Sequence, residues 1–412
     1  MSRYKQRGVV TLFVTSILLV IALVMVLASY RHVFYQIKRS HNEVKARQAH
    51  WRAEGGIECV YAYLKGSPNL VPDLTTPGHG LLDSICKETL ALDDLYLRAL
   101  TASDYVIESQ GPTHELKKSF YWGSMTGLGA IQTTADLRIR GSAAIAADAP
   151  KKPNGEGEYE CVAIRYKHRV TFESPTGASL STEDPMPNGP YPGFSGDCAS
   201  SHKTSTTEGG NTTDDPDLFA QDYLKDDDLD PFYNYFGVTK TTSNISNIKL
   251  DYHVINNPDV SDGQTCHQQL ANAFTSHDKV WVEGHCVLSA PLAVTGPRSL
   301  VVANGIFAST GSTSYSGSFF HMVDRTSPAF SDENLASYWS EVSFFSAIES
   351  LLSTHTVYFD NGAFHPKGGM HFDSPNGEVV LNGSYDLDYS SANSLYQRPK
   401  TLMWNNGGWY AK

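Results

Sequence analysis

The longest apolar stretch of the chain, residues 9–30, lies near its beginning. Its polar interruptions are Thr11, Thr15, Ser16 and Ser29. As a helix rising about 1.5 Å per residue, this stretch extends roughly 33 Å, which is enough to cross a bilayer. Basic residues precede it, at Arg3, Lys5 and Arg7. Because Lys and Arg are enriched on the cytoplasmic side, the sequence predicts a cytoplasmic N-terminus and places the rest of the chain across the membrane.

Apolar residues continue beyond this stretch at seven-residue spacing, as Tyr30, Ile37, Val44 and Trp51, with charged residues between them. The pattern predicts that the helix continues to about Leu64, for a total length of roughly 80 Å. A seven-residue repeat drifts only slowly around an α-helix, so the four residues suit burial against a neighbouring subunit's helix or against the protein's own head. The pair Gly55-Gly56 is the expected place for a bend.

The sequence after the helix predicts an αβ head over residues 65–174, with a short helix at 81–100 and a strand at 103–108. Residues 135–142 and 161–166 alternate between apolar and polar positions, as half-buried strands do. Residues 175–230 are rich in Pro, Gly, Ser and Asp. This composition predicts an irregular insertion that is packed onto the head or partly disordered.

Residues 231–412 predict a β-rich C-terminal domain. Short apolar strands at 280–284, 300–305, 357–362 and 378–383 each end in Gly, and three of them end in Asn-Gly. Repeated strands of this kind describe the rungs of a β-solenoid, although Asn-Gly also favours hairpins. A predicted helical segment at 332–353 interrupts them. We therefore expect an α+β protein with a long N-terminal helix and a large β-rich head containing a short, imperfect β-solenoid, with a β-sandwich as the alternative.

The net charge and the cysteine content limit which ligands the head can bind and whether its cysteines form disulfides. A net charge of −12 disfavours broad electrostatic binding to DNA or acidic lipid. Basic residues cluster locally at 151–152 and 165–169, where exposed positions of alternating strands explain them as well as a nucleic-acid patch does. The six cysteines show neither a CxxC pair nor metal-ligand spacing: Cys59, Cys86, Cys161, Cys198, Cys266 and Cys286. An even count after an export signal favours three disulfides, most simply between sequence neighbours, although fifteen connectivities are possible.

Clustered aspartates make a calcium site worth considering, because hard cations take clustered oxygen ligands. The candidates are Asp226, Asp228 and Asp230. The spacing of an EF-hand is absent, since no Gly stands at the sixth position and no Glu at the twelfth. A solvated loop with helix N-cap residues explains the same aspartates, so no metal or other cofactor is expected.

No enzymatic motif stands out. The segment 193–196 lacks the spacing of a serine-nucleophile elbow, and neither His-Glu-x-x-His nor a phosphate loop is present. Asp386 and Asp388 form the best carboxylate pair for a glycosidase, but a solvated strand edge explains them too. The sequence therefore predicts a protein that is not an enzyme. Trp404, Trp409 and Tyr410 crowd the C-terminal stretch and suit either stacking on sugar rings or capping of a β-core.

The N-terminus carries a resemblance to a known family. The basic leader ends in Gln6-Arg7-Gly8 and is followed by Val9 and the apolar helix, which resembles the class III signal of type IV prepilins. The resemblance implies that a prepilin peptidase cuts after Gly8 and methylates the new N-terminal amine of Val9, which divides the chain into a leader at 1–8 and a pilin helix at 9–64. The segment 53–58, Ala-Glu-Gly-Gly-Ile-Glu, further resembles the minor pilin family called PilX.

One position departs from the pilin pattern. Ordinary pilins carry Glu five residues into the mature chain, where it pairs with a neighbour's N-terminal amine, and here that position is Phe13. An unpaired carboxylate in hydrocarbon is costly, so a subunit without it has lost the pairing or never needed it. A subunit at the filament tip has no neighbour above it, and the tip pseudopilin of type II secretion also lacks this Glu. We expect a position at or near the tip; a divergent single-pass membrane protein is the plainer alternative.

The resemblance implies a minor pilin that joins other minor pilins in a tip complex, primes pilus assembly, and presents a surface for adhesion or DNA capture. The expected partners are other minor pilins, the major pilin, the prepilin peptidase, and a surface glycan or DNA. The expected location is the bacterial inner membrane before assembly and the extracellular pilus tip afterwards. Two alternatives stay open: a minor pseudopilin of a type II secretion system, and a stand-alone membrane-anchored adhesin or carbohydrate-binding protein.

Overall fold

The chain divides into two compact units that are described separately. Unit 1 comprises residues 1–123 and 400–412, and unit 2 comprises residues 124–399. The computed structural model describes residues 7–67, 70–75, 80–101, 103–175, 177–208, 211–212, 218–257, 263–289, 292–310, 314–362, 364–395 and 399–411. The division differs from the predicted one, because the expected boundaries at 174/175 and 230/231 both fall inside unit 2 and the last strand of the chain belongs to unit 1.

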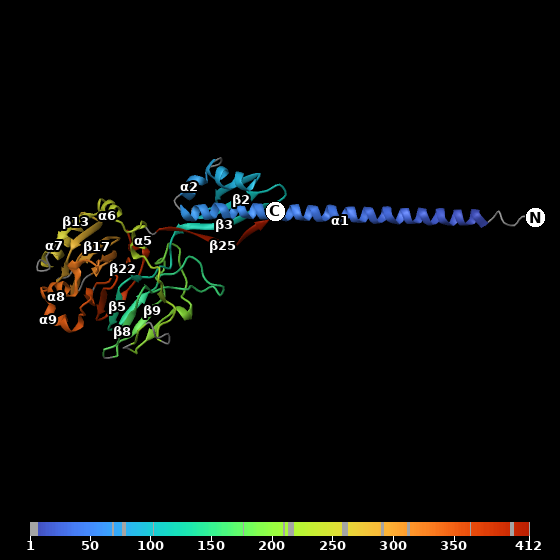
Figure 1. Ribbon diagram of the computed structural model, residues 1–412. Helices are drawn as coiled ribbons and strands as arrows, with labels where there is room; N and C mark the ends of the chain where they lie inside the picture. Colours follow the sequence, from blue (N-terminus) through green and yellow to red (C-terminus); the bar gives the residue numbers. More distant parts are fainter. Residues whose placement is uncertain are drawn as a thin grey trace, which may run out of the picture. The chain divides into compact units, whose positions relative to one another are not determined.

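Unit 1 is one long helix with a small antiparallel sheet (Figure 1). Helix α1 (Arg7–Gly66) is followed by short helical segments, α2 (Val71–Leu74), α3 (Gly80–Leu82), a π-helical turn at Asp83–Lys87, and α4 (Glu88–Leu90). The sheet has the order β1-β2-β3-β25. Its strands are β1 (Asp94–Ala99), β2 (Asp104–Gln110), β3 (Glu115–Ser124) and β25 (Lys400–Ala411). Adjacent strands β1, β2 and β3 pair antiparallel.

Most element predictions for unit 1 are confirmed, with two corrections. The long helix and the strand near residue 104 are present. The predicted helix at 81–100 is wrong in its second half, because residues 94–99 form β1 and pair with β2 over six positions. Helix α1 continues through Gly55-Gly56, where a bend was expected. Gly56 instead permits close packing, since a Cβ there would meet Leu92 and Ser109 side chains at 2.6 Å.

Unit 2 consists mainly of parallel strands in three sheets through which the chain passes in turn. The first sheet has the order β12-β7-β4-β22-β20-β17-β14-β13, and every neighbouring pair in it is parallel. Its strands are β4 (Ile131–Thr133), β7 (Ile164–Tyr166), β12 (Tyr223–Lys225), β13 (His253–Asn257), β14 (Lys279–Gly284), β17 (Ser299–Ala303), β20 (Ser318–Met322) and β22 (Met370–Asp373).

The second sheet has the order β11-β8-β5-β23-β21-β18-β15, and the third has the order β10-β9-β6-β24. Both are parallel except at the end strands β11 and β10. The second sheet contains β5 (Asp136–Arg140), β8 (Val170–Glu173), β11 (Asn211–Thr212), β15 (Cys286–Leu288), β18 (Phe307–Thr310), β21 (Thr356–Asn361) and β23 (Glu378–Asn382). The third contains β6 (Ala143–Ala146), β9 (Leu180–Glu183), β10 (Ser205–Thr206) and β24 (Tyr385–Leu387), and a separate parallel pair joins β16 (Ala293–Val294) to β19 (Ser314–Tyr315).

Both faces of the first sheet are buried, which explains its continuous apolar runs. In β17, Leu300 and Val302 point into the core enclosed by the sheets, whereas Val301 points outward. The outward side chains pack against α5 (Pro231–Phe236) and α6 (Thr242–Lys249). The outer face of the second sheet is covered by α8 (Asp332–Ser340) and α9 (Phe345–Ile348), which confirms the predicted helical interruption.

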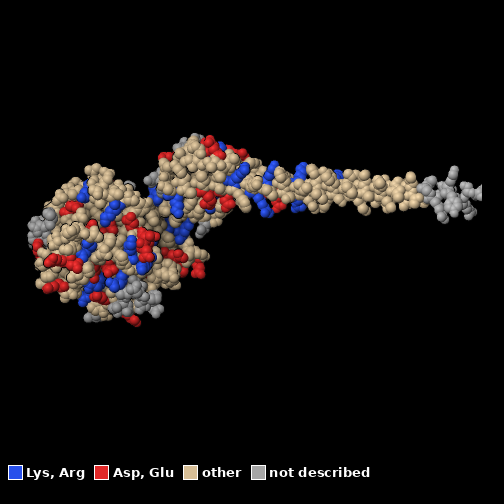
Figure 2. All heavy atoms as spheres, viewed as in Figure 1, with Lys and Arg blue, Asp and Glu red and all other residues tan. Residues whose placement is uncertain are grey.

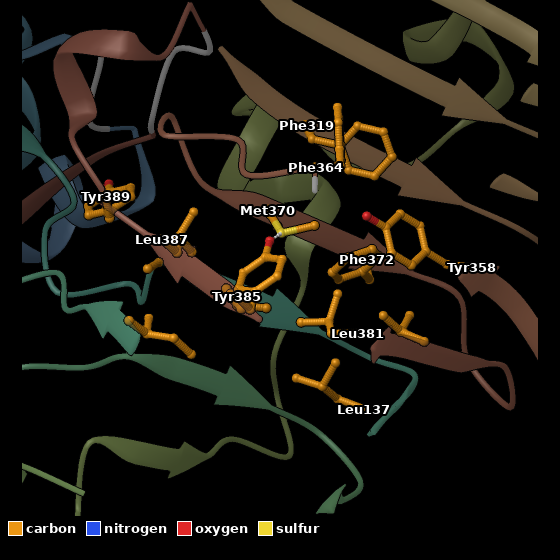
Figure 3. Packing of buried hydrophobic residues seen from close by; sticks show 14 of the residues in the cluster. Leu137, Phe319, Tyr358, Phe364, Met370, Phe372, Leu381, Tyr385, Leu387 and Tyr389 are labelled. Atoms are coloured by element: carbon orange, nitrogen blue, oxygen red, sulfur yellow. Dashed lines mark hydrogen bonds between the residues drawn. The ribbon is translucent and has the colours of Figure 1, made fainter. Parts of the chain in front are cut away.

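Aromatic side chains from neighbouring parallel strands pack against one another in the core of unit 2 (Figure 3). Phe307 and Tyr358 occupy paired positions on neighbouring strands, and their rings lie 5.0 Å apart and nearly parallel. Phe319 and Phe372 extend the same core. Such pairs add to the free energy gained by burying the rings.

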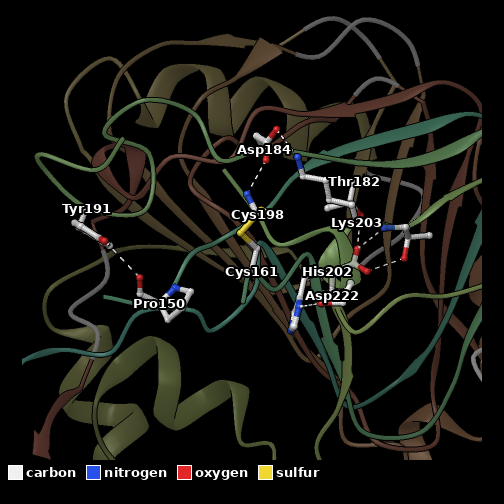
Figure 4. Close-up of a disulfide and its surroundings, with 11 residues drawn as sticks. Pro150, Cys161, Thr182, Asp184, Tyr191, Cys198, His202, Lys203 and Asp222 are labelled. Atoms are coloured by element: carbon white, nitrogen blue, oxygen red, sulfur yellow. Dashed lines mark hydrogen bonds and ion pairs between the residues drawn. A yellow bond between two sulfur atoms is a disulfide. The ribbon is translucent and has the colours of Figure 1, made fainter. Parts of the chain in front are cut away.

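Three disulfides join sequence neighbours, so the simplest expected pairing is the observed one: Cys59–Cys86, Cys161–Cys198 and Cys266–Cys286. The first ties α1 to the π-helical turn of unit 1. The second holds the irregular segment around residue 198 (Figure 4), where the Asp184 carboxylate accepts hydrogen bonds from the Cys198 backbone at 2.8 Å and from Lys203 at 2.7 Å. The third ties α7 (Gly263–Ala273) to β15. The predicted irregular insertion at 175–230 thus contributes short strands and a disulfide to unit 2.

Glycine is required where the chain turns after the paired strands β5 and β23 of unit 2. Gly141 and Gly383 follow the paired strands β5 and β23, and both have positive φ, of 109° and 102°. A Cβ on Gly141 would collide with the carbonyl oxygen of Gly383. The chain segments that follow β5 and β23 therefore approach each other more closely than any other residue type permits.

We expect Gly141→Ala to lower the free energy of unfolding by at least about 2 kcal/mol, because it adds both backbone strain and a steric clash. Gly155→Ala is the matched control, since nothing lies within 4 Å of a Cβ there and its φ is not positive. Chemical denaturation of the two variants followed by circular dichroism measures the difference. Equal midpoints for the two variants would show that the corner tolerates a side chain.

Candidate functional site

The N-terminal part of α1 is exposed over its described length. All described side chains from Val10 to Lys45 are exposed. Among the described residues, α1 is the one helix long and apolar enough to cross a membrane. Two hydroxyls of the apolar run are satisfied within the helix: Thr15 donates to the Thr11 carbonyl at 3.0 Å and Ser16 to the Phe13 carbonyl at 2.8 Å. This segment therefore places no unsatisfied hydroxyl of these residues in hydrocarbon.

The C-terminal part of α1 packs against its own sheet. The buried residues recur at intervals of three and four: Ala49, Ala53, Ile57, Val60 and Leu64. They join the core of unit 1 together with residues of β1, β2 and β3. Small residues at the first two positions let the helix approach the sheet closely. The C-terminal part of α1 thus packs on the sheet of unit 1, whereas the side chains from Val10 to Lys45 are exposed.

The seven-residue repeat lies on the face of α1 that the sheet does not cover. We call Tyr30, Ile37, Val44 and Trp51 the apolar stripe. Their side chains are 69%, 62%, 51% and 70% exposed. At roughly 100° per residue, the apolar stripe and the buried face lie on nearly opposite sides of the helix. The sheet of unit 1 therefore does not cover these four residues, and their burial against a neighbouring subunit's helix stays a prediction.

The expected processing site lies at the start of the described chain. Gly8 and Val9 belong to α1, while residues 1–6 of the predicted leader lie outside the described residues. Phe13, the position that carries Glu in ordinary pilins, is 64% exposed on the apolar part of the helix. An exposed phenyl ring suits lipid or a hydrophobic neighbour.

The candidate calcium ligands have local structural roles. Asp226 pairs with Arg165 at 3.0 Å and accepts a hydrogen bond from the backbone of Asp228. Asp230 caps α5 by accepting from the Tyr233 N–H at 2.9 Å, as the N-cap interpretation expected. Among the described residues, no three His, Cys, Asp or Glu side chains are grouped so as to hold a metal ion. Aspartates within 213–217 lie outside the described residues.

The C-terminal tryptophans line a small aromatic cluster in unit 1. Trp404 stacks on Tyr61 of α1, with ring centroids 3.8 Å apart, and Lys118 Nζ lies 3.8 Å from the Trp404 ring and 4.3 Å from the Trp409 ring. Lys118 also pairs with Glu58 at 2.8 Å. The side chain of Tyr410 lies outside the described residues. Trp404 thus packs the last strand against α1, which is the capping role, whereas Trp409 is 43% exposed.

Two details of this cluster had no signal in the sequence. Tyr61 donates to the Leu402 carbonyl at 3.1 Å. Burial, with a smaller contribution from the Glu58 carboxylate, raises the pKa of the Tyr61 hydroxyl, which keeps it protonated as a donor. Lys118 was not a candidate because it meets Trp404 only through the pairing of β3 with β25. A contact between residues so distant in the chain leaves no local pattern.

The remaining sequence candidates are dispersed over unit 2. Asp388 pairs with Lys367 at 2.8 Å, while Asp386 is exposed on β24. The basic residues of 165–169 are partly neutralised, since Arg165 pairs with Asp226 and Arg169 with Asp136. The structure does not bring the candidates in unit 2 together into one site.

Unit 2 also has a hollow of about 580 Å³ lined by residues that include Glu160, Arg165, His202 and Tyr223. The Arg165 guanidinium is engaged there, donating to the Gly127 carbonyl at 2.8 Å and the Leu128 carbonyl at 3.1 Å. These hydrogen bonds therefore fix the Arg165 side chain at the edge of the hollow. That the chain is not an enzyme stays a prediction.

Comparison of the chain with protein families, characterised proteins and solved structures finds no match.

We expect Trp404→Ala to lower the free energy of unfolding of unit 1 by about 2 kcal/mol or more, because it removes a large stacked side chain from between β25 and α1. Trp409→Ala is the comparison, and its more exposed ring is expected to cost under about 1 kcal/mol. Urea denaturation of the detergent-solubilised chain, followed by circular dichroism, measures both. An unchanged midpoint for Trp404→Ala, combined with lost binding on a glycan array, would favour the sugar-stacking role instead.

Proposed function

We propose that the chain is a minor pilin of a type IV pilus, related to the PilX-like family, that acts in the complex at the pilus tip and primes assembly. The observation that carries the proposal is the division of α1. One part packs on the antiparallel sheet of unit 1, and the other part is apolar, exposed and marked by the apolar stripe on the uncovered side. A subunit that is stored in a membrane and then joins a helical bundle needs this combination, since the same helix must suit lipid first and neighbouring helices later.

The proposed route begins in the inner membrane. The leader is cut after Gly8, Val9 becomes the methylated N-terminus, and the exposed part of α1 passes from lipid into a bundle of pilin helices. Phe13 supports a position at the tip of the pilus. A subunit with no neighbour above it has no N-terminal amine with which a carboxylate at this position could pair. Three disulfides support a head that folds outside the cytoplasm, where oxidising conditions preserve them.

We further propose that unit 2 is a short, imperfect β-solenoid that forms the exposed end of the subunit. Support comes from the parallel pairing of successive rungs in three sheets, since β-sandwiches are built from antiparallel strands. In this proposal, unit 2 is an insertion between β3 and β25 of a pilin-like head, and its surface carries the adhesive or DNA-capturing role.

A minor pseudopilin of a type II secretion system is the second candidate, because Phe13 fits the tip of either assembly. The exposed α1 and its processing are shared by both, so the choice between them depends on the partner subunits. A stand-alone membrane-anchored adhesin would keep its leader and would have no use for the apolar stripe beyond the membrane.

We expect the full chain, co-expressed with an active prepilin peptidase, to lose residues 1–8 and to begin with N-methylated Val9, as read by mass spectrometry of the intact protein. Gly8→Glu should prevent the cut, because it removes the residue on which the class III signal ends. Gly66→Glu, at the far end of α1, is the matched control and should be processed normally. An intact leader on the wild-type chain, beside a prepilin that the same enzyme does cut, would refute the pilin proposal.

A further inference from the structure

A second seven-residue repeat runs beside the apolar stripe of α1. Each residue of the apolar stripe is followed directly by a basic residue, and these four form what we call the basic stripe: Arg31, Lys38, Lys45 and Arg52. A strict seven-residue repeat shifts by only about 20° per heptad around a straight helix. The basic stripe therefore stays on one side of α1, next to the apolar stripe, over roughly 32 Å of helix.

The basic stripe has no ion-pair or hydrogen-bond partner among the residues that the structure describes. All four side chains are exposed, and none makes an ion pair or a side-chain hydrogen bond with the described residues. Residues 31–52 contain six Lys and Arg and a single acidic residue, Glu43, which pairs with Arg47 at 2.9 Å outside the basic stripe. Figure 2 shows basic side chains gathered on this part of α1, whereas the apolar part beyond it is almost uncharged.

This local charge is opposite in sign to that of the whole protein. The segment 31–52 has a net charge of +5, from six basic residues minus one acidic residue, whereas the full chain has −12. Four unpaired cations in line on an exposed helix are not needed for packing on the sheet, because the burial of α1 begins only at Ala49 and all four side chains stay exposed. Their placement beside an apolar seam is the arrangement by which helices select partners through flanking charges.

We propose that this face of α1 docks an α-helix of a different subunit, one that carries Asp or Glu at seven-residue spacing beside its own apolar seam. The inference rests on the proposed function, in that the partner is another membrane-anchored subunit whose helix lies alongside α1. The apolar stripe supplies buried area, and the basic stripe supplies register and choice of partner.

A second copy of this chain fits poorly. Two copies that docked through this face would bring one basic stripe close to the other, and α1 offers no acidic repeat to separate them. Like charges placed across a helix interface disfavour that pairing, so the face selects against self-association. The partner must therefore differ in sequence from this chain.

An anionic membrane surface fits poorly as well. For a helix that leaves the bilayer steeply, Lys45 and Arg52 lie roughly 21 Å and 32 Å beyond Arg31. The field of charged lipid headgroups falls off within a Debye length of about 8–10 Å. Lipid can thus engage the beginning of the basic stripe but not its far end, whereas a parallel helix engages all of it.

The test uses the full chain in nanodiscs of phosphatidylcholine and two fluorescent helical peptides of four heptads. Both peptides carry the same Leu seam; one has Glu and the other has Lys at the flanking position of each heptad. Fluorescence anisotropy at low salt should give at least about tenfold tighter binding of the Glu peptide, and the difference should shrink at high salt. The double substitution Lys38→Gln and Lys45→Gln should weaken binding of the Glu peptide by about threefold to tenfold.

The matched control compares two single substitutions, Lys38→Gln in the basic stripe and Arg39→Gln on the side of the helix away from the apolar stripe. Arg39→Gln should change the affinity by less than about twofold. Lys38→Glu with Lys45→Glu should reverse the preference and favour the Lys peptide. Equal losses in the two single Gln variants would overturn the proposal, because net charge alone would then explain binding. Equal affinity for both peptides would also overturn it. So would a chain that does not discriminate between the peptides but binds phosphatidylglycerol-containing vesicles, with weaker binding in the variant at Lys38 and Lys45.

The pilin assignment and the docking face of α1 can be refuted independently of each other. Peptide binding is measured on the chain whether or not the leader has been cut, so an intact leader with clear peptide discrimination would remove the pilin assignment and keep the docking face. Correct processing without discrimination would remove only the docking face.

Discussion

The architecture of unit 2 depends on one long-range pairing. The first three strands of the unit, β4, β5 and β6, lie inside their sheets. In each sheet the first strand stands between the strand that follows it in sequence, β7, β8 or β9, and one of the last three strands, β22, β23 or β24. Met370 pairs with Ile131 across this seam. The continuous core of the sheets closes only when the beginning and the end of the unit have met. Because such non-local pairings carry a large loop-closure cost, this unit belongs among slowly folding topologies.

The same pairing explains how so large a unit can stand between two strands of a small sheet. With the first and last strands of the unit paired, the ends of unit 2 come together, and the Met125 N–H donates to the Pro399 carbonyl at 3.0 Å. An insertion whose ends meet does not require the strands on either side of it to separate. This accounts for β3 and β25 lying next to each other in unit 1 although unit 2 separates them in sequence.

The ends of a stack of parallel strands need protection, since an unpaired edge invites further strands. Here β10 and β11 pair antiparallel at one end of their sheets, and α7 packs against β15 at the other. A disulfide lies near each of these regions, Cys161–Cys198 and Cys266–Cys286. By the chain-entropy estimate, closing loops of these lengths stabilises the folded state by about 3–4 kcal/mol each. The cross-links therefore reinforce the parts of unit 2 that have neighbours on one side only.

The sequence by itself determined the features that depend on local order along the chain. An apolar run of bilayer length, a repeat of seven and alternating short strands each report a period that the backbone imposes. The long helix, several of the β strands and the helical interruption at 332–353 were therefore predicted correctly. The tertiary structure decided which side of α1 the sheet covers, and it showed that the apolar stripe is left uncovered. It also decided that residues 94–99 are a strand, that 400–411 return to unit 1, and that Lys118 lies over Trp404. These features depend on contacts between residues far apart in the chain, and no local pattern of residues records such contacts.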